Sequence, residues 1–149
     1  MRKIYKNFLK EDEVNIITDF YKSKMGGGLT LKINNNKHEV LDSIINKLKD
    51  DFLFEVKSQS YWRLESRQSG HPWHRDTGSN NQMPWCQVGV SILLKKGNSG
   101  GETYYADDDK ETNKIKSNRK LYDLVAHTSD EWHMVTPHEG SRSVLLMFI

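Results

Sequence analysis

The sequence predicts an α+β fold in which two helices precede a series of short antiparallel strands. Three observations support this prediction. Apolar residues recur at every third or fourth position in the first third of the chain, as on one face of an amphipathic helix. After residue 52 the chain is instead rich in aromatic and branched residues, with an apolar period of two in places, which is typical of strands. Glycine and proline separate these later segments, as expected of turns.

Each predicted helix carries one apolar face. The first is expected over residues 10–23, and the glycines at 26–28 end its pattern because glycine loses much backbone entropy in a helix. The second is expected to be capped by Asn36, since Glu39 stands three residues later, as in a capping box. The two apolar faces consist of Val14, Ile17, Phe20 and Tyr21 in the first helix, and of Val40, Leu41, Ile44, Ile45 and Leu48 in the second.

The rest of the chain supplies the strands, expected at residues 29–33, 52–56, 61–65, 88–94, 103–105, 121–126 and 142–149. Residues 107–120 are almost wholly polar and are interpreted as a solvated loop, with a basic run that forms a solvated face: Lys110, Lys114, Lys116, Arg119 and Lys120. Helices followed by many antiparallel strands predict a double-stranded β-helix (jelly roll) with the N-terminal helices packed on one sheet. Without an internal repeat, residues 1–149 are expected to form a single domain.

Composition limits the classes of function. The chain has 149 residues, of which 36% are hydrophobic and 28% charged, as in globular proteins. A net charge of +2 does not fit a dedicated nucleic-acid binder, so no nucleic-acid partner is expected. No apolar run approaches the ~20 residues of a membrane span, and no secretory signal is evident. The lone Cys86 excludes an internal disulfide, is interpreted as a packed side chain, and fits a cytoplasmic location.

The strongest chemical signal is the triplet His74-Arg75-Asp76. Residues two apart in an extended chain point to the same side, so an imidazole and a carboxylate can aim at one point. His133 is the candidate for a third ligand from another segment. Two histidines and one carboxylate on one side of a metal leave three positions open, an arrangement that suits iron(II) oxygen chemistry.

Arg142 is the second signal. It begins an apolar stretch and, in a strand, shares one side with Val144, Leu146 and Phe148. An uncompensated buried charge is costly, and the sequence shows no obvious inward acid nearby. A dicarboxylate ligand would supply the missing partner, because a guanidinium matches a carboxylate bidentately.

Three segments together resemble the prolyl-4-hydroxylase-like branch of the Fe(II)/2-oxoglutarate oxygenases, over roughly residues 60–149. His74-Arg75-Asp76 matches the H-x-D motif of that family. Gly100-Gly101-Glu102-Thr103 followed by Tyr104 matches its G-G-E-T-aromatic strand. His133-x-Val135-x-Pro137 followed by Gly140-x-Arg142 matches its segment for the distal histidine and 2-oxoglutarate. The three occur in the family's order and spacing.

The resemblance implies a role for each matched position. His74, Asp76 and His133 would bind Fe(II), and Arg142 would pair with the C5 carboxylate of the cosubstrate 2-oxoglutarate. Its C1 carboxylate and keto oxygen would chelate the metal, and the cosubstrate O2 would take the last position. The reaction would yield succinate, CO2 and a hydroxylated substrate. Family members that halogenate lack the carboxylate, so Asp76 favours hydroxylation.

The chain departs from the family at two tyrosine positions that serve the cosubstrate. Leu64 stands about where many members have a tyrosine before the H-x-D histidine, and Tyr61 or Arg63 is expected to substitute. Leu93 replaces a second tyrosine, and Ser91 on the same side of that strand is a polar candidate.

Residues on either side of the H-x-D motif are candidates for contact with the substrate. His71 and Trp73 directly precede the proposed ligand His74 and are candidates for the substrate mouth. Residues 77–85 follow Asp76 and could form a lid. The remaining histidines, His38, His127 and His138, are interpreted as surface or hydrogen-bonded core residues.

Three functions compete at this point. The first is a dioxygenase that hydroxylates a peptidyl residue such as proline, or a small molecule, with nucleobase demethylation a poorer match because no second arginine closely follows Arg142. The second is a catalytically silent jelly-roll domain that binds metal or a partner. The third is a zinc hydrolase with the same ligands, against which stands the lack of a convincing general base.

Overall fold

The computed structural model describes residues 1–24, 30–77 and 83–149. Its helices are Glu11–Lys24 (α1) and Glu39–Leu48 (α2), with a short 3-10 helix at Ile33–Asn35 (η1). The strands are Arg2–Tyr5 (β1), Leu31–Lys32 (β2), Tyr61–Arg67 (β3), His71–His74 (β4), Val88–Lys95 (β5), Ser99–Gly100 (β6), Thr103–Ala106 (β7), Ile115–Lys116 (β8), Leu124–Thr128 (β9), Trp132–Val135 (β10), His138–Glu139 (β11) and Arg142–Phe148 (β12). No described helix is long and apolar enough to cross a membrane.

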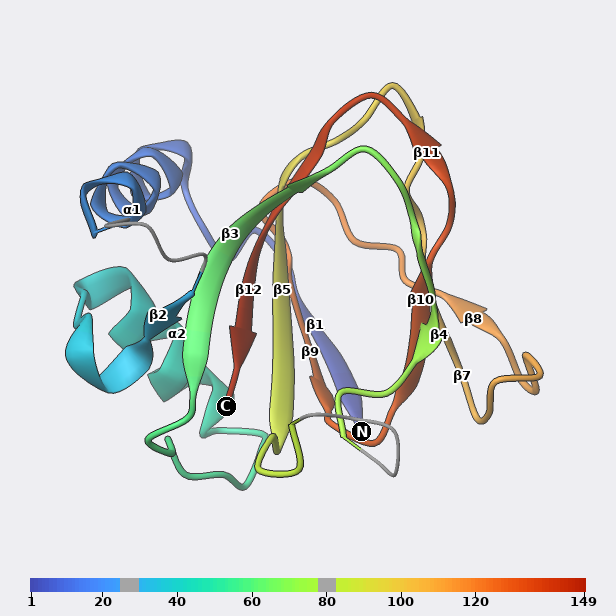
Figure 1. Cartoon of the computed structure of the whole chain (residues 1–149), viewed down its shortest axis with the longest axis horizontal. Helices are drawn as coiled ribbons and strands as arrows, with labels where there is room; N and C mark the ends of the chain where they lie inside the picture. Colours follow the sequence, from blue (N-terminus) through green and yellow to red (C-terminus); the bar gives the residue numbers. More distant parts are fainter. Residues whose placement is uncertain (25–29, 78–82) are drawn as a thin grey trace.

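The strands form antiparallel sheets. Six strands pair in the order β1-β9-β5-β12-β3-β2, four in the order β4-β10-β7-β8, and β11 pairs with β6. Figure 1 shows the six-stranded sheet in the middle, the helices on its left and the four-stranded sheet on its right. Antiparallel sheets with two N-terminal helices are compatible with the predicted α+β jelly roll.

Strand β12 divides the interior into two regions. It lies between β3 and β5, and its alternating side chains point to opposite faces of the six-stranded sheet. Leu145 and Met147 are fully buried in the core that the sheet shares with both helices. Arg142, Val144 and Leu146 face the other way and line a cavity between the two large sheets. The same strand therefore serves the core on one side and a cavity on the other.

The helices contact the sheet through aromatic side chains. Trp62 of β3 is fully buried, and its ring lies 6.2 Å from that of Phe20 and 5.2 Å from that of Tyr21, between centroids. Helix α1 spans nearly the residues predicted for it, and both apolar faces join the core cluster. Cys86 is buried, as its interpretation as a packed side chain requires.

The predicted N-cap of the second helix is wrong by two residues. Helix α2 begins at Glu39, and His38 is its N-cap, with Nδ1 accepting a hydrogen bond from the Val40 N–H at 3.1 Å. Asn36 instead ends the 3-10 helix, where its N–H donates to the Ile33 carbonyl. An imidazole nitrogen can cap a helix as an oxygen does, so the capping-box pattern misplaced the boundary.

The strand predicted over residues 52–56 is absent. Phe52 and Phe54 are buried and Leu53 is fully exposed, so the side chains do alternate. The backbone, however, makes no sheet pairing. Glu55 instead donates its N–H to the Gln87 side chain at 3.2 Å and accepts from that amide at 2.9 Å. A side-chain amide thus replaces the neighbouring strand that the prediction assumed.

Other boundaries differ less. The strand predicted at 121–126 is β9, which begins and ends later, and the polar loop 107–120 contains the short strand β8. Of the strand predicted at 29–33, residues 31–32 form β2 and residue 33 begins the 3-10 helix, whereas residue 29 lies outside the described residues. The lid suggested at 77–85 falls largely on residues 78–82, which also lie outside them.

Candidate metal centre and adjoining cavity

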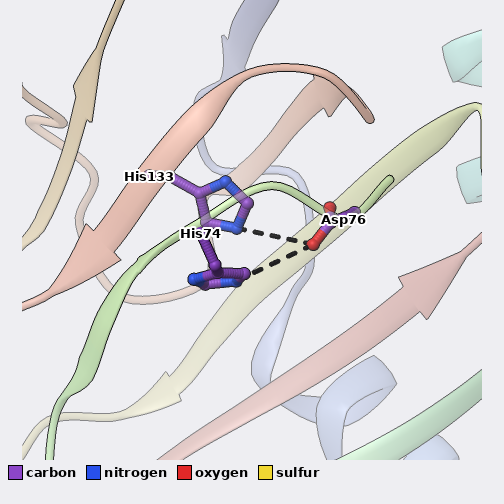
Figure 2. Close-up of side chains that lie close together, drawn as sticks. All are labelled: His74, Asp76 and His133. Atoms are coloured by element: carbon purple, nitrogen blue, oxygen red, sulfur yellow. Dashed lines mark ion pairs between the residues drawn. The ribbon is translucent and has the colours of Figure 1, made fainter. Parts of the chain in front are cut away.

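Three side chains converge on one point, two from strands of the four-stranded sheet and one from just after β4. His74 ends β4, Asp76 follows two residues later, and His133 lies in β10 directly opposite His74 in the strand register. One donor atom from each of the three lies within 4.8 Å of the others. Figure 2 shows both imidazole rings directed at the carboxylate of Asp76.

The donor atoms are spaced as ligands of one metal ion would be. Asp76 Oδ1 lies 3.8 Å from His74 Nε2 and 3.6 Å from His133 Nε2. Two atoms that each lie about 2.1 Å from a shared ion are separated by about 3 to 4 Å. The spacing and the chemistry of two imidazoles and one carboxylate therefore fit a divalent transition metal such as iron(II).

Backbone carbonyls orient both imidazoles for this role. His74 Nδ1 lies 2.9 Å from the carbonyl oxygen of Pro72, and His133 Nδ1 lies 2.9 Å from that of Glu131. Because a carbonyl can only accept, each ring carries its proton on Nδ1. Nε2 of both rings is then left with a lone pair that points toward Asp76, the tautomer that metal ligation requires.

A third histidine holds the carboxylate. His127 Nε2 lies 2.7 Å from Asp76 Oδ2, and its Nδ1 lies 3.0 Å from the hydroxyl of Tyr105. All three groups are buried. The second oxygen of Asp76 is thus occupied, which directs Oδ1 toward the two Nε2 atoms. The interpretation of His127 as a hydrogen-bonded core residue holds, but its partner is a candidate metal ligand.

The protonation states favour metal binding at neutral pH. Burial lowers the pKa of His133 to about 3 and also lowers the pKa of His74. Burial acts to raise the pKa of Asp76, but the hydrogen bond from His127 is the main opposing effect, and the pKa lies below its usual value. Two neutral imidazoles face one carboxylate, which are the forms that bind metals.

The candidate metal centre opens onto the cavity between the sheets, which has a volume of about 110 Å³. Arg142 lines this cavity and is only 8% exposed. Within the described part of the chain, no hydrogen bond or ion pair joins its guanidinium to another side chain. A buried guanidinium beside the candidate metal centre matches the charge and the planar shape of a carboxylate.

The expectation that no acid faces inward near Arg142 is wrong, because Glu65 on the adjacent strand also lines the cavity. Its carboxylate is, however, already engaged. It pairs with Arg63 at 2.7 Å and accepts a short hydrogen bond from Arg67. Its negative charge acts on Arg142 only at a distance, where it partly offsets the lowering of the Arg142 pKa by burial.

The remaining predicted site residues fall into two groups. Ser91, Arg63 and His71 line the cavity, and the ring of His71 lies 3.9 Å from that of His74, between centroids. Tyr61 and Trp73 do not line it. The Tyr61 hydroxyl contacts Met83 Sδ at 3.4 Å, and the Trp73 indole donates to Glu111 at 3.1 Å.

Sequence reasoning missed three charged residues of the cavity, namely Glu65, Arg67 and Arg119. Arg119 belongs to the basic run interpreted as a solvated face, yet it is only partly exposed and lines the cavity beside Ser91. Its guanidinium donates to the Ser91 hydroxyl at 2.7 Å. The interpretation of the basic run is therefore wrong at this position. The available signal was position: Arg119 lies close before the buried strand β9.

Comparison with known proteins shows the fold. No family model matches the chain. No curated protein matches it at a significant level. Solved structures do match: a viral collagen prolyl hydroxylase from Paramecium bursaria Chlorella virus-1, in a 2OG complex, is 17% identical with a TM-score of 0.66, and the match covers 99% of this chain and 94% of that one.

Two further solved structures also match the fold of this chain. A prolyl hydroxylase from Trichoplax adhaerens, in complex with a peptide fragment of the hypoxia inducible factor oxygen degradation domain, is 14% identical with a TM-score of 0.65, covering 99% of this chain and 82% of that one. A prolyl 4-hydroxylase from Phytophthora capsici is 16% identical with a TM-score of 0.64, and the 99% of this chain that matches spans 57% of that chain. The protein thus has the fold of prolyl 4-hydroxylases.

Proposed function

We propose that the protein is a non-haem iron(II) dioxygenase that couples oxidative decarboxylation of 2-oxoglutarate to hydroxylation of a substrate. The observation that carries the proposal is the convergence of His74, Asp76 and His133 within 4.8 Å, beside a cavity lined by Arg142, a cation without an ion-pair partner among the described residues. Likeness to prolyl hydroxylases supports it. Iron bound at such a centre supplies the oxidising chemistry, in which 2-oxoglutarate, O2 and a C–H bond yield succinate, CO2 and an alcohol.

The chain's own residues bind and orient the reactants. Nε2 of His74 and of His133, with Asp76 Oδ1, would hold the metal on one side and leave the other side open. Arg142 would pair with the distal carboxylate of 2-oxoglutarate through its planar fork. Val144 and Leu146 form an apolar wall beside this carboxylate, which excludes water and strengthens the ion pair.

A peptidyl residue such as proline is the substrate that we propose. The Trichoplax adhaerens structure contains a peptide fragment, and the viral structure is described as a collagen prolyl hydroxylase. His71 lies at the cavity next to His74 and is placed to contact such a substrate. A small molecule remains the other candidate class and is included in the test below.

We further infer that residues 1–149 act as one unit, in which both helices back the six-stranded sheet. The burial of Trp62 against Phe20 and Tyr21 supports this inference. The helices contribute no residue to the cavity. Their role would be to keep strands β3, β5 and β12 rigid beneath the reacting groups.

The direct test is succinate formation from 2-oxoglutarate under air with added iron(II), with peptides and small metabolites screened for stimulation and for a mass gain of one oxygen. We expect slow turnover without substrate, faster turnover with a proline-containing peptide, and loss of turnover in Asp76→Ala and His133→Ala. Wild-type protein that binds iron and 2-oxoglutarate but forms no succinate with any substrate would instead favour a silent binding domain.

A further inference from the structure

The cavity beside the metal centre has an excess of positive charge. Its lining contains four arginines, Arg63, Arg67, Arg119 and Arg142, but only two carboxylates, Glu65 and Asp76. Glu65 is engaged by Arg63 and Arg67, and Asp76 by His127. Two arginines are thus left, for which no ion pair with a described carboxylate exists within 4.0 Å.

The charge of Arg142 acts on the guanidinium of Arg119. Burial, and after it the positive charge of Arg142, lowers the pKa of Arg119 to about 10, so Arg119 remains charged at neutral pH. Both arginines also line a second cavity, whose other charged residues are Lys96, Lys116, Lys120 and Glu102. Glu102 is engaged there by a short ion pair with Lys116. Like charges that are partly removed from water repel each other, and an anion placed between them relieves this cost.

Arg119 is held firmly in position. It donates to the Ser91 hydroxyl at 2.7 Å and carbonyl at 3.3 Å, and to the Thr103 hydroxyl at 3.3 Å. Ser91 belongs to the six-stranded sheet and Thr103 to the four-stranded sheet, so Arg119 joins the two across the cavity. Hydrogen bonds on both sides of Arg119 fix its segment. The N–H of Ser117 donates to the Thr103 carbonyl, and the N–H of Lys120 donates to the Asp123 carboxylate.

These contacts also direct the two hydroxyls. A guanidinium can only donate, so Ser91 and Thr103 accept from Arg119 and keep their own protons for another acceptor. Both side chains line the same cavity as Arg142. These three contacts use part of the five N–H donors of Arg119. This end of the cavity therefore offers donors from two guanidiniums and two hydroxyls, and a carboxylate offers acceptors.

We propose that Arg119 is a second cation of the cosubstrate pocket, which binds the distal carboxylate of 2-oxoglutarate together with Arg142 and makes the pocket select dicarboxylic 2-oxo acids. This inference rests on the proposed function and adds a specificity-determining residue to it. Ser91 and Thr103 complete the carboxylate site and take the place of the tyrosine hydroxyls that Leu64 and Leu93 cannot supply.

The test measures binding, without turnover, of two ligands that differ only in the distal carboxylate. Protein loaded with Mn(II) in place of iron is titrated with 2-oxoglutarate and with 2-oxopentanoate by calorimetry. We expect the wild type to prefer 2-oxoglutarate strongly. In Arg119→Met, affinity for 2-oxoglutarate should fall about tenfold to hundredfold, with affinity for 2-oxopentanoate changed by less than about twofold.

Two further variants separate binding from folding and from general electrostatics. Arg119→Lys keeps the charge and should recover part of the preference, which a merely structural role would not predict. Lys120→Met removes a neighbouring charge outside the first cavity and should preserve the preference. Circular dichroism and melting temperature establish that each variant is folded.

The outcomes distinguish this inference from the proposed function. If wild-type protein binds 2-oxoglutarate and Arg119→Met loses the preference for it over 2-oxopentanoate, the result supports both the role of Arg119 and the proposed function. If the wild type binds 2-oxoglutarate but Arg119→Met retains the preference, or weakens both ligands equally, the role of Arg119 is refuted and the proposed function is untouched. If the metal-loaded wild type does not bind 2-oxoglutarate, the proposed function itself fails.

Discussion

Two glycines leave room for the side chains that form the site. A Cβ atom on Gly89 would lie 2.2 Å from Asp76 Oδ2 and 2.6 Å from His127 Nε2, and one on Gly101 would lie 2.9 Å from Arg142 Cδ. Gly101 also has a φ of +71°, which side-chain-bearing residues rarely adopt. Neither position tolerates a larger residue without displacing a group of the site.

The two glycines should therefore affect different ligands. Gly89→Ala would push Asp76 away from its position, so affinity for Mn(II) should fall by about tenfold or more. Gly101→Ala should leave Mn(II) affinity within about twofold but weaken binding of 2-oxoglutarate, because it displaces Arg142. Calorimetric titration of both variants checks this. Equal Mn(II) affinities for Gly89→Ala and the wild type would contradict the assigned close contact.

The sequence indicated some site residues and not others for a physical reason. His74 and Asp76 are two apart, and a local spacing is visible in any sequence. His127 reaches Asp76 because β5 and β9 pair with Gly89 opposite His127, which depends on the register of strands far apart in the chain. Arg119 is directed inward by contacts on both sheets. No local pattern marks such residues.

At the scale of elements, one buried carboxylate joins the N-terminal segment to strand β9. Asp123 is 1% exposed and accepts hydrogen bonds from the N–H of Asn7 at 2.7 Å and of Lys120 at 2.8 Å, and it forms an ion pair with Lys6 at 3.3 Å. Burial acts to raise the pKa of Asp123, but these donors outweigh it and lower the pKa below the usual value.

Asp123→Ala should cost about 1 to 3 kcal/mol of unfolding free energy at pH 7, because it leaves buried N–H groups unpaired. The folded-state pKa lies below the unfolded one, so the contribution of the carboxylate is complete above about pH 4 and is lost as the pH falls through the folded value. Urea unfolding at pH 7 and pH 3 checks both statements. A difference between wild type and variant that grows on acidification would contradict them.

The contact between α1 and the sheet gives a second prediction at this scale. Trp62→Ala should cost about 3 to 5 kcal/mol, because it removes a fully buried ring that Phe20 and Tyr21 contact. Ile16→Ala, on the exposed side of the same helix, should change stability by less than about 0.5 kcal/mol. Chemical unfolding of the two variants provides the comparison, and similar losses in both would argue against the packing described.

Elements were predictable where burial alone decides them. The helical period at Val14, Ile17 and Tyr21 led to α1 almost to the residue. The alternation at 52–56 was equally clear but belongs to an extended segment whose partner is the Gln87 side chain. Side-chain periodicity reports which face is buried and does not report which group pairs with the backbone.

At the scale of the molecule, the apolar core and the charged cavity lie on opposite faces of the six-stranded sheet. Figure 1 shows the six-stranded sheet between the helices and the four-stranded sheet. The apolar core lies on the helix side of the six-stranded sheet, and the charged and candidate metal-ligating side chains line the cavity on its other side. The core can therefore supply stability while the cavity carries buried charges that are costly without a ligand. Stabilisation by metal and 2-oxoglutarate together should follow from mass action.

The central claim is that His74, Asp76 and His133 form one metal site that prepares the cavity for 2-oxoglutarate. The most direct measurement is an anaerobic calorimetric titration of wild-type protein and of the His74→Ala/His133→Ala double variant, first with iron(II) and then with 2-oxoglutarate. We predict that the wild type binds a single iron(II) ion per chain and then 2-oxoglutarate, and that the double variant binds neither appreciably. Equal iron(II) affinities for the two proteins would contradict the account.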